Sequence, residues 1–141
     1  MIYLGTSGFS YNDWVGNFYP LGMPKREWFI YYVREFNTCE INSTFYALPK
    51  LSSLKAMVEK TGEGFLFSIK ANQEITHRRE DNASVFKAFR QMLEPIIFAG
   101  KLGCILAQFP YSFRFNRRNW DYLELFRERL DRKSTRLNSS H

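Results

Sequence analysis

The sequence predicts an α/β fold in which about four βα units build a parallel sheet. Short apolar runs rich in β-branched and aromatic residues alternate with longer amphipathic runs. This alternation is typical of parallel strands joined by crossover helices, and not of a sandwich or a helical bundle. Hydrophobic residues make up 45% of the 141-residue chain and aromatic residues 18%, a composition sufficient for a substantial core.

The expected strands are residues 2–7, 38–45, 65–71 and 103–109. Successive side chains of a strand point to opposite faces of its sheet. The third strand should therefore turn Phe65, Phe67 and Ile69 toward the helices. Its other face, which should point to the interior of the domain, carries Leu66, Ser68 and Lys70.

The expected helices cover about residues 25–36, 51–62, 82–95 and 116–130. Asp81 or Asn82 is a suitable cap for the third of them. Pro95 should bend or end that helix, because proline removes a backbone hydrogen-bond donor. The last helix carries its apolar residues at Trp120, Leu123, Phe126 and Leu130.

The segment from Cys39 to Tyr46 is the most informative, because it puts a carboxylate and a carboxamide on one face of an expected strand. Alternation points Glu40, Asn42 and Thr44 one way. It points Ile41, Ser43 and Phe45 the other way. Buried polar groups need compensating interactions, so we interpret the first face as a site and the second as structural.

Several segments, in this order, resemble the signature of the YecE-like family of unknown function. They are residues 5–11 with Trp14 and residues 18–20, residues 40–46 with Pro49, residues 67–70 with Thr76 and His77, and residues 102–103 with residues 108–110. The resemblance implies a (β/α)8 barrel. A complete barrel takes about 250 residues, so we expect residues 1–130 to be the truncated N-terminal half of one.

Residues 131–141 lack any apolar period. Every codon of a common sequencing-library adapter fits them in frame, so we expect a translated, non-native adapter there. The alternative is a native disordered tail.

Charge and cysteine content exclude several classes of protein. The formal net charge of +6 falls to +4 without residues 131–141. The remaining basic groups gather locally at residues 77–79 and 114–118, which makes nucleic acid a possible but unfavoured partner. Cys39 and Cys104 fall in expected strands, where we expect them to be reduced and buried. With no apolar run of membrane-spanning length and no secretory signal, a cytoplasmic protein without membrane contact is expected.

In a (β/α)8 barrel the active site lies at the carboxyl ends of the strands. Each expected strand supplies a polar residue late in its course, and these residues are Ser7, Asn42, Lys70 and Gln108, with Glu40 a layer deeper. A hydrogen-bonded interior layer that only fixes packing is the alternative.

Lys70 is the strongest single candidate for a site residue, because a lysine that faces the interior of the barrel must pair with a carboxylate or lose its proton. Glu40 on the neighbouring strand is the expected partner, and the pair would hold Lys70 ready for an anionic oxygen. A desolvated lysine acting as a base or a Schiff-base nucleophile is the less favoured alternative.

His77 follows the third strand on the catalytic side, where it could act as an acid or base or be simply solvated. Trp14 and Tyr19 could wall a pocket or belong to a hydrophobic cluster that anchors their loop. No residues have metal-ligand spacing, and the sequence identifies no cofactor.

We therefore expect a small polar or anionic ligand at the strand ends, with possible acid–base catalysis by Glu40, Lys70 and His77. Ser7, Asn42, Gln108, Trp14 and Tyr19 are the expected ligand-binding residues. The alternative is a noncatalytic module that binds phosphate or nucleic acid. Either way, a half-barrel should self-associate through its unpaired edges.

Overall fold

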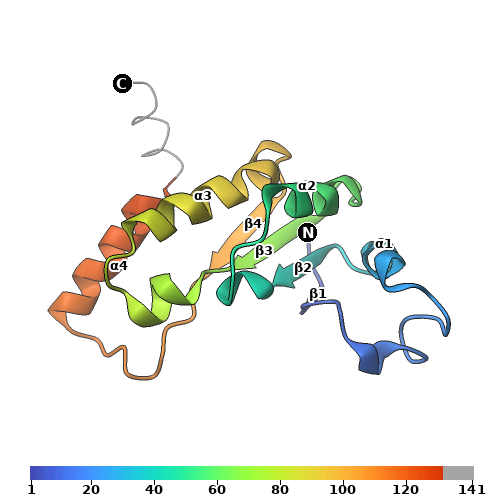
Figure 1. The fold of residues 1–141 in the computed structure, drawn as a ribbon, viewed down its shortest axis with the longest axis horizontal. Coiled ribbons are helices and arrows are strands. Elements are labelled where there is room, and N and C mark those ends of the chain that lie inside the picture. Colours follow the sequence, from blue (N-terminus) through green and yellow to red (C-terminus); the bar gives the residue numbers. More distant parts are fainter. Residues whose placement is uncertain (132–141) are drawn as a thin grey trace.

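The computed structural model describes residues 1–131 and forms one four-stranded parallel sheet in the order β1-β2-β3-β4 (Figure 1). The strands are β1 (Gly5–Ser7), β2 (Thr38–Ile41), β3 (Leu66–Lys70) and β4 (Leu102–Leu106). The predicted α/β class with parallel strands is confirmed. The predicted adapter, from residue 132 onward, lies outside the described residues.

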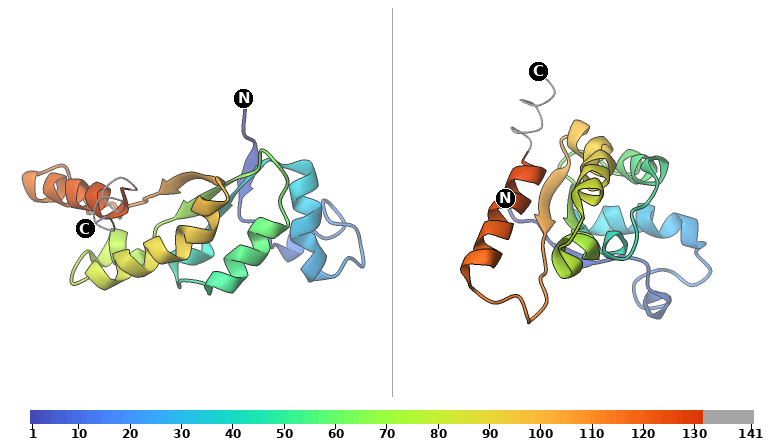
Figure 2. Two further views of the ribbon diagram at one scale, coloured as in Figure 1. Left: turned by 90° about the horizontal axis from the view of Figure 1, so that it is seen from above. Right: turned by 60° about the vertical axis from the view of Figure 1, so that its left-hand side comes forward.

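Helices connect successive strands, and α1, α2 and α3 lie along one face of the sheet (Figure 2). The α-helices are α1 (Trp28–Glu35), α2 (Leu51–Glu59), α3 (Ala83–Phe98) and α4 (Arg117–Leu130). Short 3-10 turns are η1 (Asn12–Trp14), η2 (Lys25–Glu27) and η3 (Ser43–Phe45), and η4 (Glu74–Arg78) is a π-helical turn. The fourth helix, α4, packs against α3.

The two faces of the sheet differ as the alternation predicts. The face toward the helices buries apolar side chains of β2 and β3, namely Cys39, Ile41, Phe67 and Ile69. On the opposite face, which we call the open face, the side chains are exposed or half-buried. In register, the open face carries Ser7, Glu40, Ser68, Lys70, Cys104 and Leu106.

Tyr32 of α1 joins the helix layer to two strands. Its fully buried hydroxyl donates to the carbonyl oxygen of Thr38 at 3.0 Å and accepts from the amide of Thr6 at 2.8 Å. Burial raises the pKa of this phenol to about 12. One buried hydroxyl therefore fixes α1 against β1 and β2.

The second strand is shorter than predicted and ends at Ile41. Asn42 has helical backbone angles (φ −100°, ψ −21°), and the next three residues form η3. Side-chain alternation therefore stops at Ile41, and Thr44 is fully buried instead of sharing the face of Glu40. The expected strand through Phe45 was wrong, because Asn, Ser and Thr side chains compete for backbone hydrogen bonds and favour turns.

Other elements also differ from the prediction, including the first strand, which begins at Gly5 and not at residue 2. The fourth strand ends at Leu106, so Gln108 follows the strand instead of lying within it. Helix α3 continues through Pro95 to Phe98. The segment after β3, expected to be a loop, forms η4, whose amide of Ile75 donates to the carbonyl oxygen of Asn72 at 2.9 Å.

The predicted burial of Cys104 is wrong, and only some of the apolar residues of the last helix pack against the core. Cys104 lies in β4 as expected, but it is exposed because it points to the open face. On α4, Trp120 and Leu123 are 47% and 37% exposed. Phe126 and Leu130 pack against the core together with Tyr122, and the three are spaced four residues apart along one helix face. Within residues 1–131, no helix has the length and apolarity that crossing a bilayer requires.

We expect this chain to self-associate through the unpaired edges of its sheet. Strands β1 and β4 each pair with a single neighbour, and Leu106 at the β4 edge is 36% exposed. We expect the mass from light scattering to rise with concentration, because unpaired strand edges pair with other chains. A Leu106→Lys variant should associate less.

Leu21→Lys is the matched control, because Leu21 is 82% exposed but lies in a loop outside the sheet. It should associate like the unmodified chain. A monodisperse monomer with strongly protected amides in β1 and β4 would contradict the prediction.

Candidate functional site

The carboxyl ends of the four strands bring several predicted site residues to one edge of the sheet. Ser7 ends β1, Asn42 follows β2 and Lys70 ends β3. The Asn42 amide donates to the Ser7 hydroxyl, while Asn42 Oδ1 is buried without a hydrogen-bond partner among the described residues. Gln108 is exposed two residues past β4.

Lys70 does not form the predicted ion pair with Glu40. The register pairs Glu40 with Ser68, which puts Lys70 one strand repeat further toward the carboxyl end. Its ammonium lies instead 4.6 Å from the ring centroid of Phe45, a cation–π distance. Side-chain alternation correctly places Lys70 and Glu40 on the same face of the sheet, but it does not give their positions along the strands. None of the ion pairs found within residues 1–131 includes Lys70.

Phe45 is a site residue that the sequence reasoning missed. Because η3 redirects the chain, its ring comes to the open side and also contacts His77 edge to face, with centroids 5.1 Å apart. His77 is exposed, and its Nδ1 is 2.9 Å from the hydroxyl of Thr76. Lys70, Phe45 and His77 thus form one contiguous group. In the sequence, the turn-forming residues Asn42 and Ser43 could have indicated that the strand ends before Phe45.

Hydrogen bonds from buried polar side chains fix this group. The Thr44 hydroxyl donates to the carbonyl oxygen of Lys70 at 2.6 Å. The Asn72 amide donates to the carbonyl oxygen of Thr44 at 2.9 Å, and its own oxygen accepts from the amide of Glu74 at 3.0 Å. The ends of β2 and β3 and the start of η4 therefore hold one another in place.

Glu40 lies in a polar row one level deeper on the open face. The register places Ser7 on one side of it and Ser68 on the other, with Cys104 next in the row. Ser68 Oγ and Cys104 Sγ are 3.1 Å apart. Ser7 and Glu40 are predicted site residues, whereas Ser68 and Cys104 join the row only through the strand register.

Trp14 and Tyr19 belong to an aromatic cluster that anchors the loop after β1. Tyr19 is 1% exposed, stacks on Trp28 at 4.8 Å and donates its hydroxyl to the carbonyl oxygen of Phe9 at 2.5 Å. Trp14 packs on Phe18 and Tyr19. Tyr19 is therefore buried within the cluster, as the alternative expects, whereas Trp14 is half-buried beside it.

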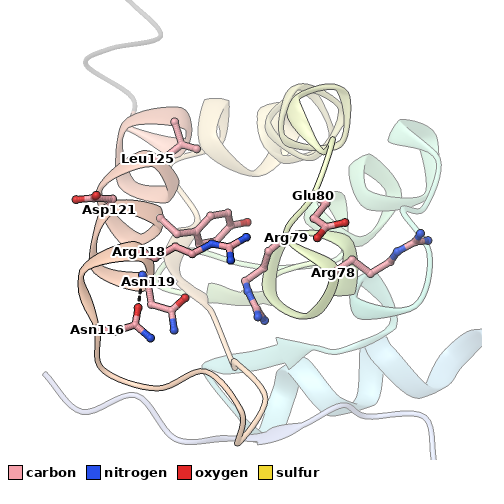
Figure 3. A pocket seen from close by; sticks show the side chains of 9 residues that line it. Arg78, Arg79, Glu80, Asn116, Arg118, Asn119, Asp121 and Leu125 are labelled. Atoms are coloured by element: carbon pink, nitrogen blue, oxygen red, sulfur yellow. Dashed lines mark hydrogen bonds between the residues drawn. The ribbon is translucent and has the colours of Figure 1, made fainter.

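A second feature lies beside the strand ends, where the two basic clusters of the sequence face each other. A groove of about 560 Å³ separates η4 and the residues after it from the start of α4 (Figure 3). Arg78 and Arg79 line one wall, and Arg118, with Asn116 and Asn119, lines the other.

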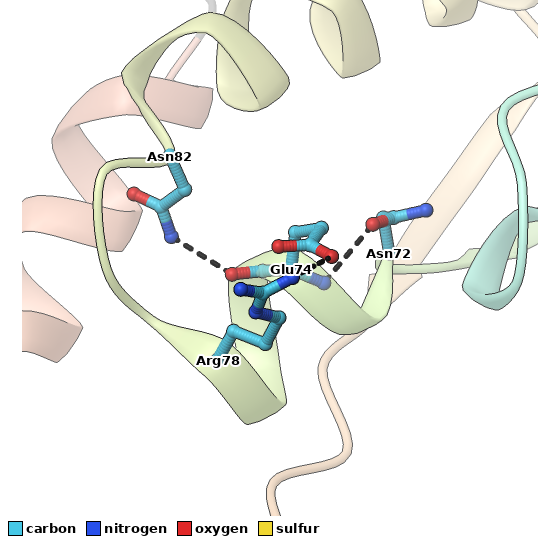
Figure 4. A network of polar contacts seen from close by, with 4 residues as sticks. All are labelled: Asn72, Glu74, Arg78 and Asn82. Carbon is cyan, nitrogen blue, oxygen red and sulfur yellow. Dashed lines mark hydrogen bonds and ion pairs between the residues drawn. The ribbon is translucent and has the colours of Figure 1, made fainter.

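The η4 wall of this groove is itself fixed by hydrogen bonds (Figure 4). Arg78 pairs with Glu74 at 3.3 Å, and the Asn82 amide donates to the carbonyl oxygen of Glu74 at 3.0 Å. The Tyr122 hydroxyl of α4 donates to the carbonyl oxygen of Ile75, and burial raises the pKa of that phenol. No cluster of three metal-ligating side chains occurs in the part of the chain that the structure describes.

These features define a parallel α/β protein with polar groups gathered at the carboxyl ends of its strands. The chain belongs to the DUF72 family, described as "Protein of unknown function DUF72", whose profile matches residues 3–137. The YecE-like resemblance is thereby confirmed.

Among curated relatives, the chain is 31% identical over 129 residues to the UPF0759 protein YunF of Bacillus subtilis, covering 87% of this chain and 45% of YunF. It is 37% identical over 115 residues to the UPF0759 protein YecE of Escherichia coli K12, covering 80% of this chain and 39% of YecE. The chain thus spans less than half the length of these relatives.

Solved structures of the same family resemble the chain closely. A DUF72 family protein of Thermotoga maritima is 36% identical with a TM-score of 0.80, over 93% of this chain and 53% of that one. A DUF72 family protein of Enterococcus faecalis has the same TM-score at 24% identity, over 94% of this chain and 48% of that one, which supports the fold alone.

Removing the Thr44 hydroxyl should loosen the strand ends. We expect Thr44→Val to lower the free energy of unfolding by about 1–3 kcal/mol, because a buried acceptor loses its donor. Urea denaturation at one fixed protein concentration measures the change. Thr61→Val removes a comparable hydroxyl, which donates to Val58 at 2.7 Å at the end of α2; water can replace that bond, so this control should change little.

The two thiols should differ in reactivity. Burial raises the pKa of Cys39 to about 11 from its ordinary value of 9.0, whereas Cys104 is exposed. At pH 8 we expect a disulfide reagent to label Cys104 rapidly and Cys39 only on unfolding, because the thiolate is the nucleophile. Mass spectrometry of labelled peptides distinguishes the two, and equal rates in the folded protein would contradict the placement of Cys39.

Proposed function

We propose that this chain forms the N-terminal four βα units of a (β/α)8 barrel that binds a small polar or anionic ligand at the carboxyl ends of its strands. The parallel order and the crossover helices support the barrel. So does the half-length match to DUF72 structures. In such barrels the loops after the strands build the site.

The observation that carries the proposal is the Lys70 ammonium, which no described carboxylate neutralises. Phe45 holds it at the end of β3 without cancelling its charge. A half-buried ammonium ion in that state gains more from an anionic oxygen than a solvated one does. An anionic ligand is the natural counter-charge.

Neighbouring polar groups suit the rest of such a ligand. The Ser7 hydroxyl and the Asn42 amide lie bonded together at the ends of β1 and β2, and Gln108 lies exposed after β4. Hydroxyl and carboxamide groups both donate and accept hydrogen bonds. They favour a ligand that carries hydroxyl or carbonyl groups beside its anionic group.

His77 and Glu40 are the groups that exchange protons with this ligand in acid–base catalysis. The contact between His77 Nδ1 and Thr76 leaves Nε2 to exchange a proton with a ligand. The Glu40 carboxylate makes no hydrogen bond or ion pair with the rest of residues 1–131, so it keeps its accepting capacity. Lys70 supplies the positive charge that pairs with the anionic group of the ligand. The ligand, and not Glu40, is the ion-pair partner of its ammonium.

Malonate, an anion without phosphate, tests this site. In titrations followed by amide NMR, we expect saturable shifts at Lys70, Phe45 and His77. Lys70→Met should weaken binding by about tenfold or more, because it removes a charge-assisted hydrogen bond. Lys70→Met should keep its stability, since Lys70 compensates no buried carboxylate.

Lys55→Met is the matched control, because Lys55 is an exposed lysine of α2 on the other side of the sheet. It should bind malonate like the unmodified chain. If both variants bind equally, or if Lys70→Met unfolds the protein, Lys70 is structural and the proposed site is wrong.

A further inference from the structure

We propose that the groove between η4 and α4 is a separate binding site for the phosphate group of a small molecule. This inference goes beyond the proposed function, because it depends on Arg79 and Arg118 and not on Lys70. The groove brings together two segments about 40 positions apart in the chain, each from a loop that follows a strand carboxyl end (Figure 3).

Two of the arginines that line the groove belong to no ion pair, although the Glu80 carboxylate also lines it. Arg78 is paired with Glu74 at 3.3 Å, and Arg117 with Asp121 at 3.3 Å. Arg79 and Arg118 have no acidic partner within residues 1–131. Figure 3 shows these two side chains reaching the groove from opposite walls.

The Arg79 guanidinium is held in a defined position. Its Nη1 donates to the carbonyl oxygens of Thr76 at 2.9 Å and His77 at 3.0 Å, and its Cζ lies 5.0 Å from the ring centroid of Phe113. These partners are uncharged, so they orient the group and leave its charge intact. Its remaining N–H donors are suited to phosphate oxygens.

The backbone of Arg79 is also costly. Its φ of 59° lies in the left-handed region, as does that of Asp81 at 46°. Non-glycine residues adopt this region at a cost in free energy. The hydrogen bonds from the Arg79 guanidinium to the carbonyl oxygens of Thr76 and His77 offset part of this cost.

Arg118 lies on the opposite wall of the groove. It is exposed in the first turn of α4 and makes no hydrogen bond or ion pair with the described residues. The amino terminus of the 14-residue α4 adds a partial positive charge. Arg118 can therefore close on a bound anion without first breaking another contact.

The size and the acidic rim of the groove favour a small molecule over a nucleic acid. A volume of about 560 Å³ falls within the usual range for small-ligand sites. Two acidic residues, Glu80 and Asp121, line the groove. Carboxylates at these positions would repel the successive phosphates of a polynucleotide, but they tolerate one phosphate group held between two arginines.

Inorganic pyrophosphate titrated into the full chain at constant ionic strength, followed by NMR of the Asn119 and Arg118 amides, tests the proposal. Arg118→Gln should weaken binding by about tenfold, and Arg118→Lys by less, because lysine keeps the charge but loses the fork geometry. Glu80→Gln should strengthen binding by about threefold to tenfold, because it removes an opposing charge. Arg127→Gln, on the same helix outside the groove, should bind like the unmodified chain.

Lys70→Met separates this site from the strand-end site. It should leave pyrophosphate binding unchanged, whatever its effect on malonate. The proposal is overturned if Arg118→Gln binds pyrophosphate normally, if Lys70→Met abolishes that binding, or if Glu80→Gln weakens it. It is also overturned if only a single-stranded oligonucleotide binds, which would indicate a nucleic-acid surface instead.

Discussion

The hydrogen bonds that join Thr44, Lys70 and Asn72 are the constraint on which the strand ends depend. Both polar side chains in this set are buried, Thr44 at 0% and Asn72 at 5% exposure. A buried polar group without a partner costs free energy, so η3 and η4 can occupy only the positions in which these bonds form. Changing either turn would leave a carbonyl or an amide unsatisfied.

The same bonds determine which side chains reach the open face. Because η3 begins directly after Asn42, the chain turns and Phe45 reaches the Lys70 ammonium and the His77 ring. Had β2 continued to Phe45, that ring would have pointed into the helix layer. The cation–π contact at the strand ends is therefore a consequence of buried hydroxyl and amide hydrogen bonds.

The sequence was sufficient to predict what depends on local periodicity. The βα alternation, the parallel order and the two faces of β3 follow from patterns of period two and 3.6. Periodicity does not show where a strand stops, so Thr44 and Phe45 were assigned to the wrong faces. Periodicity also predicts which face of the sheet a side chain lies on, but not its position along the strand. Glu40 and Lys70 therefore share a face without forming an ion pair.

The candidate site residues also divide into those that the fold class predicts and those that depend on tertiary contacts. The polar strand ends Ser7, Asn42 and Lys70 were predictable from the fold class, because strand carboxyl ends meet at one edge. The groove was not, because its walls depend on tertiary contacts. The Tyr122 hydroxyl bonds to Ile75 across 47 positions, and the same hydroxyl accepts from Asn82 at 3.0 Å. Long-range contacts of this kind leave no local pattern in the chain.

Three groups that hold the scaffold differ in charge from the cationic groups of the two proposed sites. Tyr32 and Cys39 are buried and Tyr122 is half-buried, and burial raises the pKa of each. A raised pKa in the folded state means that the neutral form stabilises the fold. For Tyr32 this contribution is complete below pH 10.0 and is lost as the pH rises toward about 12. Near neutral pH these three groups are uncharged, so an anion bound at the proposed sites would interact with Lys70, Arg79 and Arg118 without changing the charge of Tyr32, Tyr122 or Cys39.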